Sequence, residues 1–368
     1  MYLMNDRQRD VLSAVHDFVS NEIEPEANYR NHHGIFSDEI YRKLVQYHYH
    51  SLIIDRSYDG ASLDLVSAML ILNRIAYSDA SLAHLLETNN FGFYLPVQIF
   101  GTEQQKETYL LKAARSGEIG TIAFTEAEKT PSTVAVKCGN GYKINGSKTM
   151  VTCADIAKYA LLYCKLDEQD AMFIIDLKSP GIAIGKNEHT MGLNSIHIAD
   201  LTITDLELTE AELLSAPGKG QEIIKRSMEI MRISNAAVAL GIAQRAFDEA
   251  LSYAKLRRMD DTVTLFDMQA VKYELAVLKA ELDMLHTETF NTAHLFDCRI
   301  DQQMLFSSIT KYVVTEKAKE IVDKSFQYFG GSAYIKGTTI ERSYRDIRIF
   351  TIIGGVSEML KWSISRYL

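Results

Sequence analysis

The segment best suited to chemistry is RDIRIFTIIGGVSEML, which runs from Arg345 to Leu360. A charged run, an apolar strip and two glycines that lead into a new helix are typical of an active-site rim. Glu358 is the carboxylate of this segment that could act as a general base, and a positioned base contributes roughly 10² to 10⁴ in rate. Gly354 has no side chain, so it can contribute to a reaction only through its backbone groups.

Metal and nucleic-acid chemistry are not indicated. The four cysteines show no CxxC spacing and no flanking histidine pattern, so we expect no metal cluster and no disulfide framework, as suits a reducing cytoplasm. A net charge of −9 and a pI near 5.6 argue against a phosphate-backbone partner. The first residues lack a signal pattern and no run of eighteen apolar residues occurs, so we expect a cytoplasmic protein that does not span a membrane.

The first third of the chain must position these groups from helices. Between residue 5 and about residue 118, apolar residues recur at three- and four-residue spacing, which predicts about five helices, one of them spanning 64–87. Candidate caps and stops mark the ends of these helices: Asn5, Ser37, Thr102, Gly101 and Gly117. The segment 1–118 is therefore expected to be an all-α domain.

The period then changes twice. Between about 119 and 215, short β-branched and aromatic runs separated by Gly, Asn and Asp turns predict six to eight strands. From Gly218 to the end the helical period returns in unusually long runs, which indicates a bundle of antiparallel helices. We expect an α+β multi-domain chain, with a β-barrel-like domain at 119–215 and a four-helix bundle at 216–368.

Five ordered motifs run through this frame: AFTEAEKTPS, INGSKTMVT, MGLNS, the long run GKGQ to YAKLRR, and QYFGGSAYIKGTTIERSYRDIR. Together they resemble the motifs of the acyl-CoA dehydrogenase flavoproteins, and the resemblance covers the whole chain. It implies the three-domain fold of that family, a bound FAD and an acyl thioester as substrate, carried by CoA or by an acyl-carrier protein.

The resemblance also implies which residues meet the flavin. It places Thr125, Met150, Val151 and Thr152 beside the isoalloxazine ring, and Ser132 near the phosphates or the substrate. Threonines are favoured in strands in any case, so ordinary strand chemistry is the alternative interpretation. Met150 stands where many relatives carry an aromatic residue, and a polarizable Met can fill that space with less rigidity.

A second set of residues completes the cofactor site of a neighbouring subunit in this family. These positions are occupied by Arg257, Gln327, Gly330 and Gly331, and Val356 is assigned to the cofactor site as well. A homodimer or homotetramer with shared FAD sites follows from the resemblance. The plainer alternative is that Arg257 complements a helix dipole and that the glycines only stop a helix.

The chain departs from the family beside this arginine. Asp260 and Asp261 replace a Phe-Gly pair of the relatives, and two carboxylates near a pyrophosphate would repel it unless they turn to solvent. FAD affinity is the property that this change would alter.

The family's catalytic base is also replaced. The two positions at which relatives carry the glutamate that removes the α-proton are Gly354 and Met231 here. The N–H of Gly354 can still donate to a thioester carbonyl, as in an oxyanion hole. Arg232 either lines the substrate cleft, as its match implies, or pairs on its own helix with Glu229 or Asp248. Glu229 and Glu358 are the nearest substitutes for the base, although a surface or cofactor-side contact is the plainer interpretation of Glu358.

Three functions remain open from the sequence. The first is FAD-dependent dehydrogenation of an acyl thioester, with a displaced base. The second is a flavin-dependent monooxygenase on the same fold, which needs no such glutamate. The third is a non-catalytic flavoprotein that keeps the oligomer and the cofactor. The residues point to no particular electron acceptor.

Overall fold

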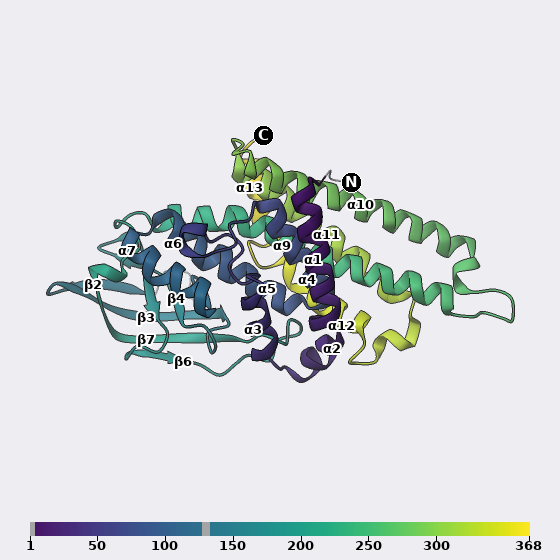
Figure 1. Ribbon diagram of the computed structural model, residues 1–368, viewed down its shortest axis with the longest axis horizontal. Coiled ribbons are helices and arrows are strands. Elements are labelled where there is room, and N and C mark those ends of the chain that lie inside the picture. The colour runs from purple at the N-terminus through teal and green to yellow at the C-terminus, as the bar shows by residue number, and fades with distance from the viewer. Residues whose placement is uncertain (1–3, 127–132) are drawn as a thin grey trace.

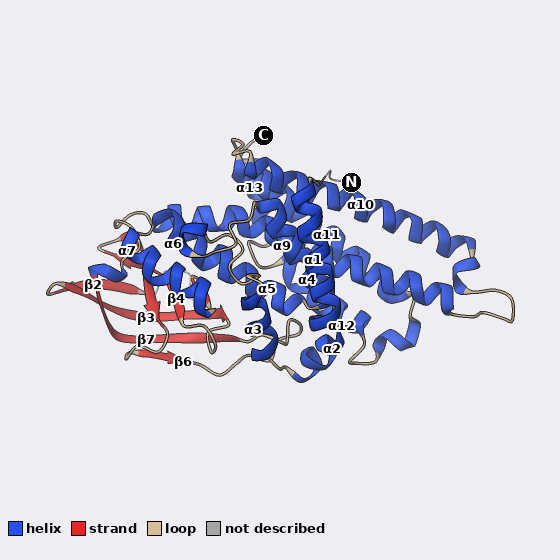
Figure 2. Cartoon of the chain, viewed as in Figure 1, coloured by secondary structure: helices blue, strands red, loops and turns tan. Residues whose placement is uncertain are grey.

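The computed structural model describes residues 4–126 and 133–368 (Figure 1). Helices, then strands, then helices follow one another along the chain, as the sequence predicts. The strands gather at one end of the long axis and the helices fill the centre and the opposite end (Figure 2). The fold is the expected multi-domain α+β architecture.

The N-terminal part forms five continuous helical stretches, three of which contain a π-helical turn. Asn5, Ser37 and Thr102 accept hydrogen bonds from backbone N–H groups in the first turn and so cap their helices, as predicted. The expected single helix over 64–87 is wrong in one respect, because it breaks at Asp79, whose extended backbone lets its carboxylate cap a new helix. The helices are α1 (Asp6–Phe18), α2 (Glu24–His33), α3 (Asp38–Gln46), α4 (Leu65–Ser78), α5 (Ala80–Glu87), α6 (Leu95–Phe100), α7 (Glu103–Lys106) and α8 (Lys112–Ser116).

The central part is a curled sheet of seven strands among the described residues. Its order is β1-β4-β2-β3-β7-β6, with β5 paired to β4, and β4 runs parallel to both β1 and β2. Alternate residues of β7 are buried, so one face of the sheet packs inward and the other faces solvent. The strands are β1 (Gly120–Ala123), β2 (Val134–Cys138), β3 (Gly141–Thr152), β4 (Tyr159–Leu166), β5 (Gln169–Asp176), β6 (Ile182–Ile184) and β7 (Ile198–Thr209).

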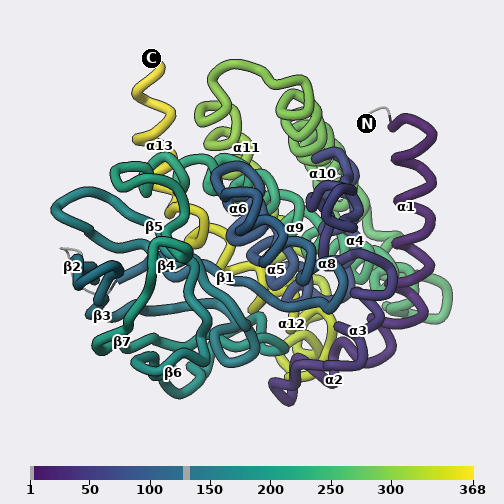
Figure 3. The backbone as a smooth tube through the Cα atoms, turned by 60° about the vertical axis from the view of Figure 1, so that its left-hand side comes forward, coloured from purple at the N-terminus to yellow at the C-terminus, as the bar shows by residue number. Residues whose placement is uncertain are grey.

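The C-terminal part is built on three long helices that pack on one another. The middle of α9 is buried on every side because α4, α10 and α11 all pack against it, so α4 joins this bundle from the N-terminal part. In Figure 3, α1 lies on the far side of this bundle from the sheet. The helices are α9 (Gly220–Leu256), α10 (Gln269–Asp297), α11 (Gln303–Gln327), α12 (Thr339–Ile347) and α13 (Ser357–Ser365).

A search of the described helices for a stretch long and apolar enough to cross a bilayer finds none.

Candidate active site

The Gly354–Gly355 turn is the centre of the candidate site. It links a short 3₁₀ helix (Arg348–Thr351) to α13, and both glycines have left-handed backbones, with φ of 68° and 106°. A side chain is strained at such φ values, so glycine is the residue that this turn favours. An ideal Cβ on Gly354 would stand 3.1 Å from Nδ2 of Asn235, which packs beneath the turn.

Two cations hold the carbonyls of this turn. Arg232 on α9 donates from Nε to the Gly354 carbonyl at 3.1 Å, and Lys311 on α11 donates from Nζ to the Gly355 carbonyl at 2.8 Å. Arg232 also donates to Oγ of Ser308 at 2.9 Å. Hydrogen bonds from charged donors are roughly twice as strong as neutral ones, so both carbonyls are fixed toward the bundle.

The N–H groups of Gly354 and Gly355 are left for a ligand by this arrangement, and that of Gly354 is the one that the sequence predicts to bind. Among residues 4–126 and 133–368 the N–H of Gly354 has no hydrogen-bond acceptor, whereas the carbonyls of Gly354 and Gly355 both accept hydrogen bonds. A backbone N–H in a fixed turn is a ready donor to a carbonyl oxygen that gains negative charge.

Lys311 is a functional candidate that the sequence interpretation missed. Its side chain is fully buried, and burial together with the nearby Arg232 lowers the pKa of its ammonium group to about 8. Its position on α11 shows no recognisable pattern, since one lysine in a long amphipathic helix is usually a surface residue. Only the packing of α11 against the turn reveals its role.

Met231, which occupies a family position of the base, and the two substitute bases Glu229 and Glu358 lie in different surroundings. Met231 is buried on α9 one residue before Arg232, and its carbonyl accepts from Nδ2 of Asn235 at 2.5 Å. Glu229 is buried but accepts from Arg226 at 3.1 Å, and so is occupied by an ion pair. Glu358 is exposed on the first turn of α13.

The alternative interpretation of Arg232 as an ion-pair partner on its own helix is wrong. Arg232 makes no ion pair with either proposed carboxylate in the described part of the chain. Asp248 instead accepts from the Tyr77 hydroxyl at 3.0 Å and from Gln244 at 2.8 Å.

On the sheet, a bulge places Met150 at the surface. The pairing of β3 with β7 shifts between Lys148 and Val151, and Met150 takes a left-handed φ of 57° with half of its surface exposed. Asp200 on β7 fixes the bulge by accepting from the N–H of Met150 at 3.0 Å and from the Thr149 hydroxyl at 2.7 Å. Bulges commonly re-aim a side chain beside an active site.

The neighbours of Met150 lie as a strand requires. Thr125 is exposed and its carbonyl accepts from the N–H of Thr149 at 2.9 Å, so Thr125 and Met150 belong to adjacent backbone segments. Val151 is buried in the core, whereas Thr152 is half-buried and its carbonyl accepts from the Thr121 hydroxyl at 2.7 Å. Ser132 lies outside the described residues.

The second set of predicted cofactor residues meets in an open pocket at the end of the bundle. Arg257, at the C-cap of α9, lines this pocket together with Gly330 and Gly331, while Tyr253 and Phe329 stack at 4.4 Å between ring centroids. Arg257 is exposed and makes no ion pair in the part of the chain that the structure describes. Gln327 is exposed at the end of α11, one turn from the glycines, and Val356 lies apart, beside the Gly354–Gly355 turn.

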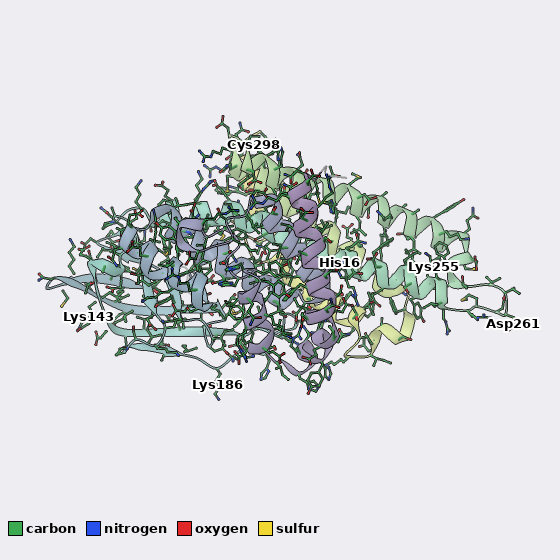
Figure 4. All side chains as sticks on the ribbon, in the orientation of Figure 1. His16, Lys143, Lys186, Lys255, Asp261 and Cys298 are labelled. Carbon is green, nitrogen blue, oxygen red and sulfur yellow. The ribbon has the colours of Figure 1, made fainter. Side chains whose placement is uncertain are left out.

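Asp260 and Asp261 do not point into this pocket as a charged pair. The carboxylate of Asp260 turns back into its own loop and accepts from the N–H groups of Thr262 and Val263, both at 2.8 Å, which lowers the pKa of Asp260. The backbone carbonyl of Asp261 accepts from Arg258 at 3.2 Å. Asp261 stands at the tip of the projecting end of the molecule (Figure 4).

The two sets of residues lie far apart within one chain. Lys255 and Asp261, which flank Arg257 in the sequence, mark the projecting end in Figure 4, and the sheet that contains β3 lies toward the other end of the long axis in Figure 2. The chain therefore offers a bulged strand in its sheet and, at the projecting end, an arginine without an ion-pair partner among the described residues beside a glycine pair.

These features fit a flavin dinucleotide, with the strand surface suited to a ring and the exposed arginine and glycines suited to a pyrophosphate. The fold and the site thus define a flavoprotein oxidoreductase. Family models for the N-terminal, middle and C-terminal domains of acyl-CoA dehydrogenases match residues 5–117, 122–206 and 218–368. The chain belongs to the acyl-CoA dehydrogenase family, and FAD is its cofactor.

Individual relatives match along their whole length. The chain is 31% identical to the "3-(aryl)acrylate reductase" of Clostridium sporogenes over 96% of both chains. It is 30% identical to the "Caffeyl-CoA reductase-Etf complex subunit CarC" of Acetobacterium woodii, over 99% of this chain and 98% of that one. It superimposes on the butyryl-CoA dehydrogenase of Megasphaera elsdenii with a TM-score of 0.95 at 26% identity, covering 100% and 99% of the two chains. The protein is an acyl-CoA dehydrogenase-like oxidoreductase that acts on CH–CH groups.

Proposed function

We propose that the protein interconverts an acyl thioester and its α,β-unsaturated form, and that it works in the direction of enoyl reduction. The observation that supports this most is the Gly354–Gly355 turn, which has an N–H without an acceptor among the described residues, available for the thioester carbonyl, but carries no carboxylate. Polarisation of the carbonyl is thus retained while the base is not.

A turn without the base is compatible with the reductive direction, which the names of the relatives suggest. Removal of the α-proton of a saturated thioester requires a strong, positioned base. Relatives carry that base, a glutamate, at one of two positions, and these positions are Gly354 and Met231 here. Reduction begins with hydride addition at the β-carbon, and the resulting enolate is basic enough to take its proton from water. The N–H of Gly354 stabilises the oxygen of that enolate.

The cofactor, when bound, supplies the hydride. We propose that its ring lies against the backbone of Thr125 and of Met150, Val151 and Thr152, with the Val151 side chain turned into the core, and that Val356 contributes to the same cofactor site. Ser132 keeps its assignment near the phosphates or the substrate. Arg257, Gln327, Gly330 and Gly331 would bind the pyrophosphate of a second chain's FAD, so we propose a homodimer or homotetramer with shared sites.

The relatives support a conjugated substrate. Two relatives at 30% identity or more are named "3-(aryl)acrylate reductase" and "Caffeyl-CoA reductase-Etf complex subunit CarC". We propose an enoyl thioester on CoA or on an acyl-carrier protein. The second name includes "Etf", and we propose an electron-transferring flavoprotein as the electron donor and the cytoplasm as the location of this protein.

The test is anaerobic flavin spectroscopy of the purified holoprotein. The reduced protein is mixed with a panel of enoyl thioesters, and the oxidised protein with the saturated counterparts. We expect rapid return of the oxidised flavin spectrum with one enoyl thioester, and slow bleaching by its saturated form.

Other outcomes assign other functions. Bleaching as fast as reoxidation would overturn the reductive direction and indicate a dehydrogenase with a displaced base. Rapid oxygen consumption by the reduced protein with a hydroxylated product would indicate a monooxygenase. A flavin that responds to neither would indicate a non-catalytic flavoprotein.

A further inference from the structure

A buried His–Glu pair lies inside the helical core, close to the Gly354–Gly355 turn. His84 and Glu87 stand one turn apart on α5, and their side chains are 6% and 0% exposed. Nδ1 of His84 lies 2.6 Å from Oε1 of Glu87. The other carboxylate oxygen of Glu87, Oε2, is buried and has no hydrogen-bond partner in the part of the chain that the structure describes.

Ring contacts place this pair next to the candidate site. The His84 ring meets the Phe350 ring edge-on, with 6.2 Å between centroids. Phe350 is fully buried and precedes Gly354 by four residues. Helix α5 also packs against α9, which carries Met231, Arg232 and Asn235. The pair therefore lies against Phe350, in the buried segment that leads into the turn that we propose holds the thioester.

Asn235 on α9 supplies a second buried acceptor, between α5 and the Gly354–Gly355 turn. Asn235 is 1% exposed and uses Nδ2 to bond the Met231 carbonyl, while its Oδ1 has no partner among the described residues. The same amide group meets the ideal Cβ position of Gly354 at 3.1 Å. Two buried acceptor oxygens without a partner among the described residues, Oε2 of Glu87 on α5 and Oδ1 of Asn235 on α9, thus lie on packed helices in otherwise apolar surroundings.

Such oxygens are costly when they stay unpaired. A buried acceptor without a donor costs about 1–3 kcal/mol, and a carboxylate oxygen costs more. Glu118 is the other carboxylate with an unpaired buried oxygen in the described ranges, but its remaining oxygen pairs with Lys158 at the protein surface. Glu87 has no such access to water, and its neighbour His84 holds it in one orientation.

We propose that Glu87 and Asn235 form a polar subsite that accepts a hydroxyl group on the acyl part of the substrate. This inference rests on the proposed function, because it requires the thioester carbonyl at Gly354. With the carbonyl bound there, the acyl group extends inward past Asn235 toward Glu87, and its hydroxyl donates to Oε2. His84 is a positioning residue that fixes the carboxylate through Oε1.

A hydroxyl suits the subsite better than an ammonium group does. An ammonium group needs three acceptors, whereas the two oxygens identified here can satisfy a hydroxyl with one donor. An ammonium ion would also be buried among apolar side chains such as Phe350, where an incompletely paired charge is strongly disfavoured.

Binding to the oxidised holoprotein tests the subsite without turnover. The probes are three saturated arylpropionyl thioesters that carry a hydroxyl, a hydrogen or an aminomethyl group (the amino probe, an ammonium ion at neutral pH) at the far end of the ring, and the readout is perturbation of the flavin spectrum. We expect the hydroxyl probe to bind about 10-fold or more tightly than the hydrogen probe, which corresponds to one satisfied buried acceptor.

Two variants distinguish loss of the proposed subsite from a general effect of removing a carboxylate charge. Glu87→Gln should reduce the hydroxyl preference to about 3-fold or less, since the replacement loses the charged acceptor. Glu118→Gln is the matched control and should keep the full preference, because Glu118 lies in a surface ion pair.

Equal binding of the hydroxyl and hydrogen probes by the wild type would overturn the proposal, and so would an unchanged preference in Glu87→Gln. Tightest binding of the amino probe would overturn the hydroxyl assignment. Failure of the proposed function has a different signature, since then no enoyl thioester reoxidises the reduced flavin even where the saturated probes bind. The wild-type comparison alone decides the matter if a variant does not fold.

Discussion

The Gly354–Gly355 turn and the Arg257 pocket are both candidate ligand sites, but they differ in how complete they are. At the turn, Arg232 and Lys311 each bond a backbone carbonyl inside a dense core, so the site is finished within one chain. At the pocket, Arg257 and the Gly330–Gly331 pair are exposed at the projecting end, without an ion-pair partner among the described residues.

This difference indicates that cofactor binding at the Arg257 pocket depends on assembly of the oligomer, whereas orientation of the substrate at the turn does not. A finished turn can orient a substrate carbonyl in an isolated chain, because its geometry is fixed by buried charge-assisted bonds. An open cation with two flexible glycines needs an incoming anionic group to define it. Chemistry at the turn is therefore expected to respond to core mutations, and cofactor affinity to protein concentration.

The largest effect is expected from restoring a base beside the turn. Met231→Glu should raise the rate at which saturated thioesters bleach the flavin by about 10² or more, since a positioned general base contributes roughly 10² to 10⁴. The measurement is stopped-flow anaerobic flavin reduction.

Met231→Gln is the matched control, because it has the same shape without the carboxylate, and it should give no gain. No gain in Met231→Glu with FAD still bound would mean that the turn does not hold a thioester.

The next largest effect is expected on FAD binding at the Arg257 pocket. Arg257→Gln should weaken FAD binding about 10- to 100-fold, because a charge-assisted contact to a phosphate contributes roughly 1.5–3 kcal/mol. Holoprotein dilution followed by flavin fluorescence measures the loss, and the wild type should release FAD as its oligomer dissociates.

Arg258→Gln serves as the control, since Arg258 bonds the Asp261 carbonyl of its own loop and should leave affinity within about 2-fold. Equal losses in both variants would argue that the pocket attracts FAD only through general charge.

A smaller effect is expected at the buried lysine. Lys311→Met should slow flavin reoxidation by an enoyl thioester about tenfold, because the Gly355 carbonyl loses its bond and the neighbouring N–H loses its fixed direction. Thermal stability should change little, since removal of the buried ammonium group offsets the loss of the hydrogen bond to the Gly355 carbonyl.

The pH profile separates this role from a purely structural one. Burial and Arg232 lower the pKa of Lys311 to about 8, against the weaker opposing influence of Glu316 and Glu358. The wild-type rate should fall as pH rises through 8, because a neutral amine donates more weakly, whereas the variant should show no such step. Lys317→Met, at an exposed ion pair with Glu320, should match the wild type. A step at pH 8 that persists in Lys311→Met would assign it to another group.

The sequence predicted the elements well because their signals are local. The helix caps at Asn5, Ser37 and Thr102 and the stop at Gly117 follow from backbone chemistry within three or four residues, and the structure confirms them. The sheet follows from a period of two and from turn residues. The break at Asp79 was missed because the apolar period continues across it, and only the cap geometry interrupts the helix.

The candidate site was predicted only in part, because its remaining members are set by packing. Gly354 and Arg232 lie in recognisable motifs, whereas Lys311, Asn235 and the His84–Glu87 pair gain meaning only when α5, α9 and α11 meet. No spacing in the chain links residue 84 to residue 354. Non-local contacts of this kind are invisible to periodicity, which explains why these buried polar groups were not foreseen.

The last prediction concerns stability rather than chemistry, at the contact between the loop before β7 and helix α12 of the bundle that carries the turn. Asp346 at the end of α12 is buried and accepts from the N–H of Leu193 at 2.7 Å. Burial raises the pKa of Asp346 to about 6, although Arg342 acts in the opposite direction. The folded protein therefore binds this proton more tightly than the unfolded chain does, and the contribution of Asp346 to stability falls as pH rises from about 4 to about 6.

Asp346→Asn keeps an acceptor for Leu193 but removes the titration. Relative to the wild type, the free energy of unfolding of the variant should improve by on the order of 2–3 kcal/mol between pH 4 and pH 7, at about 1.4 kcal/mol for each unit of pKa shift. Urea unfolding at a series of pH values measures this difference. A constant difference across the range would show that Asp346 does not titrate there, and the joint would then rest on its hydrogen bond to Leu193 alone, as a neutral contact between the loop and the bundle.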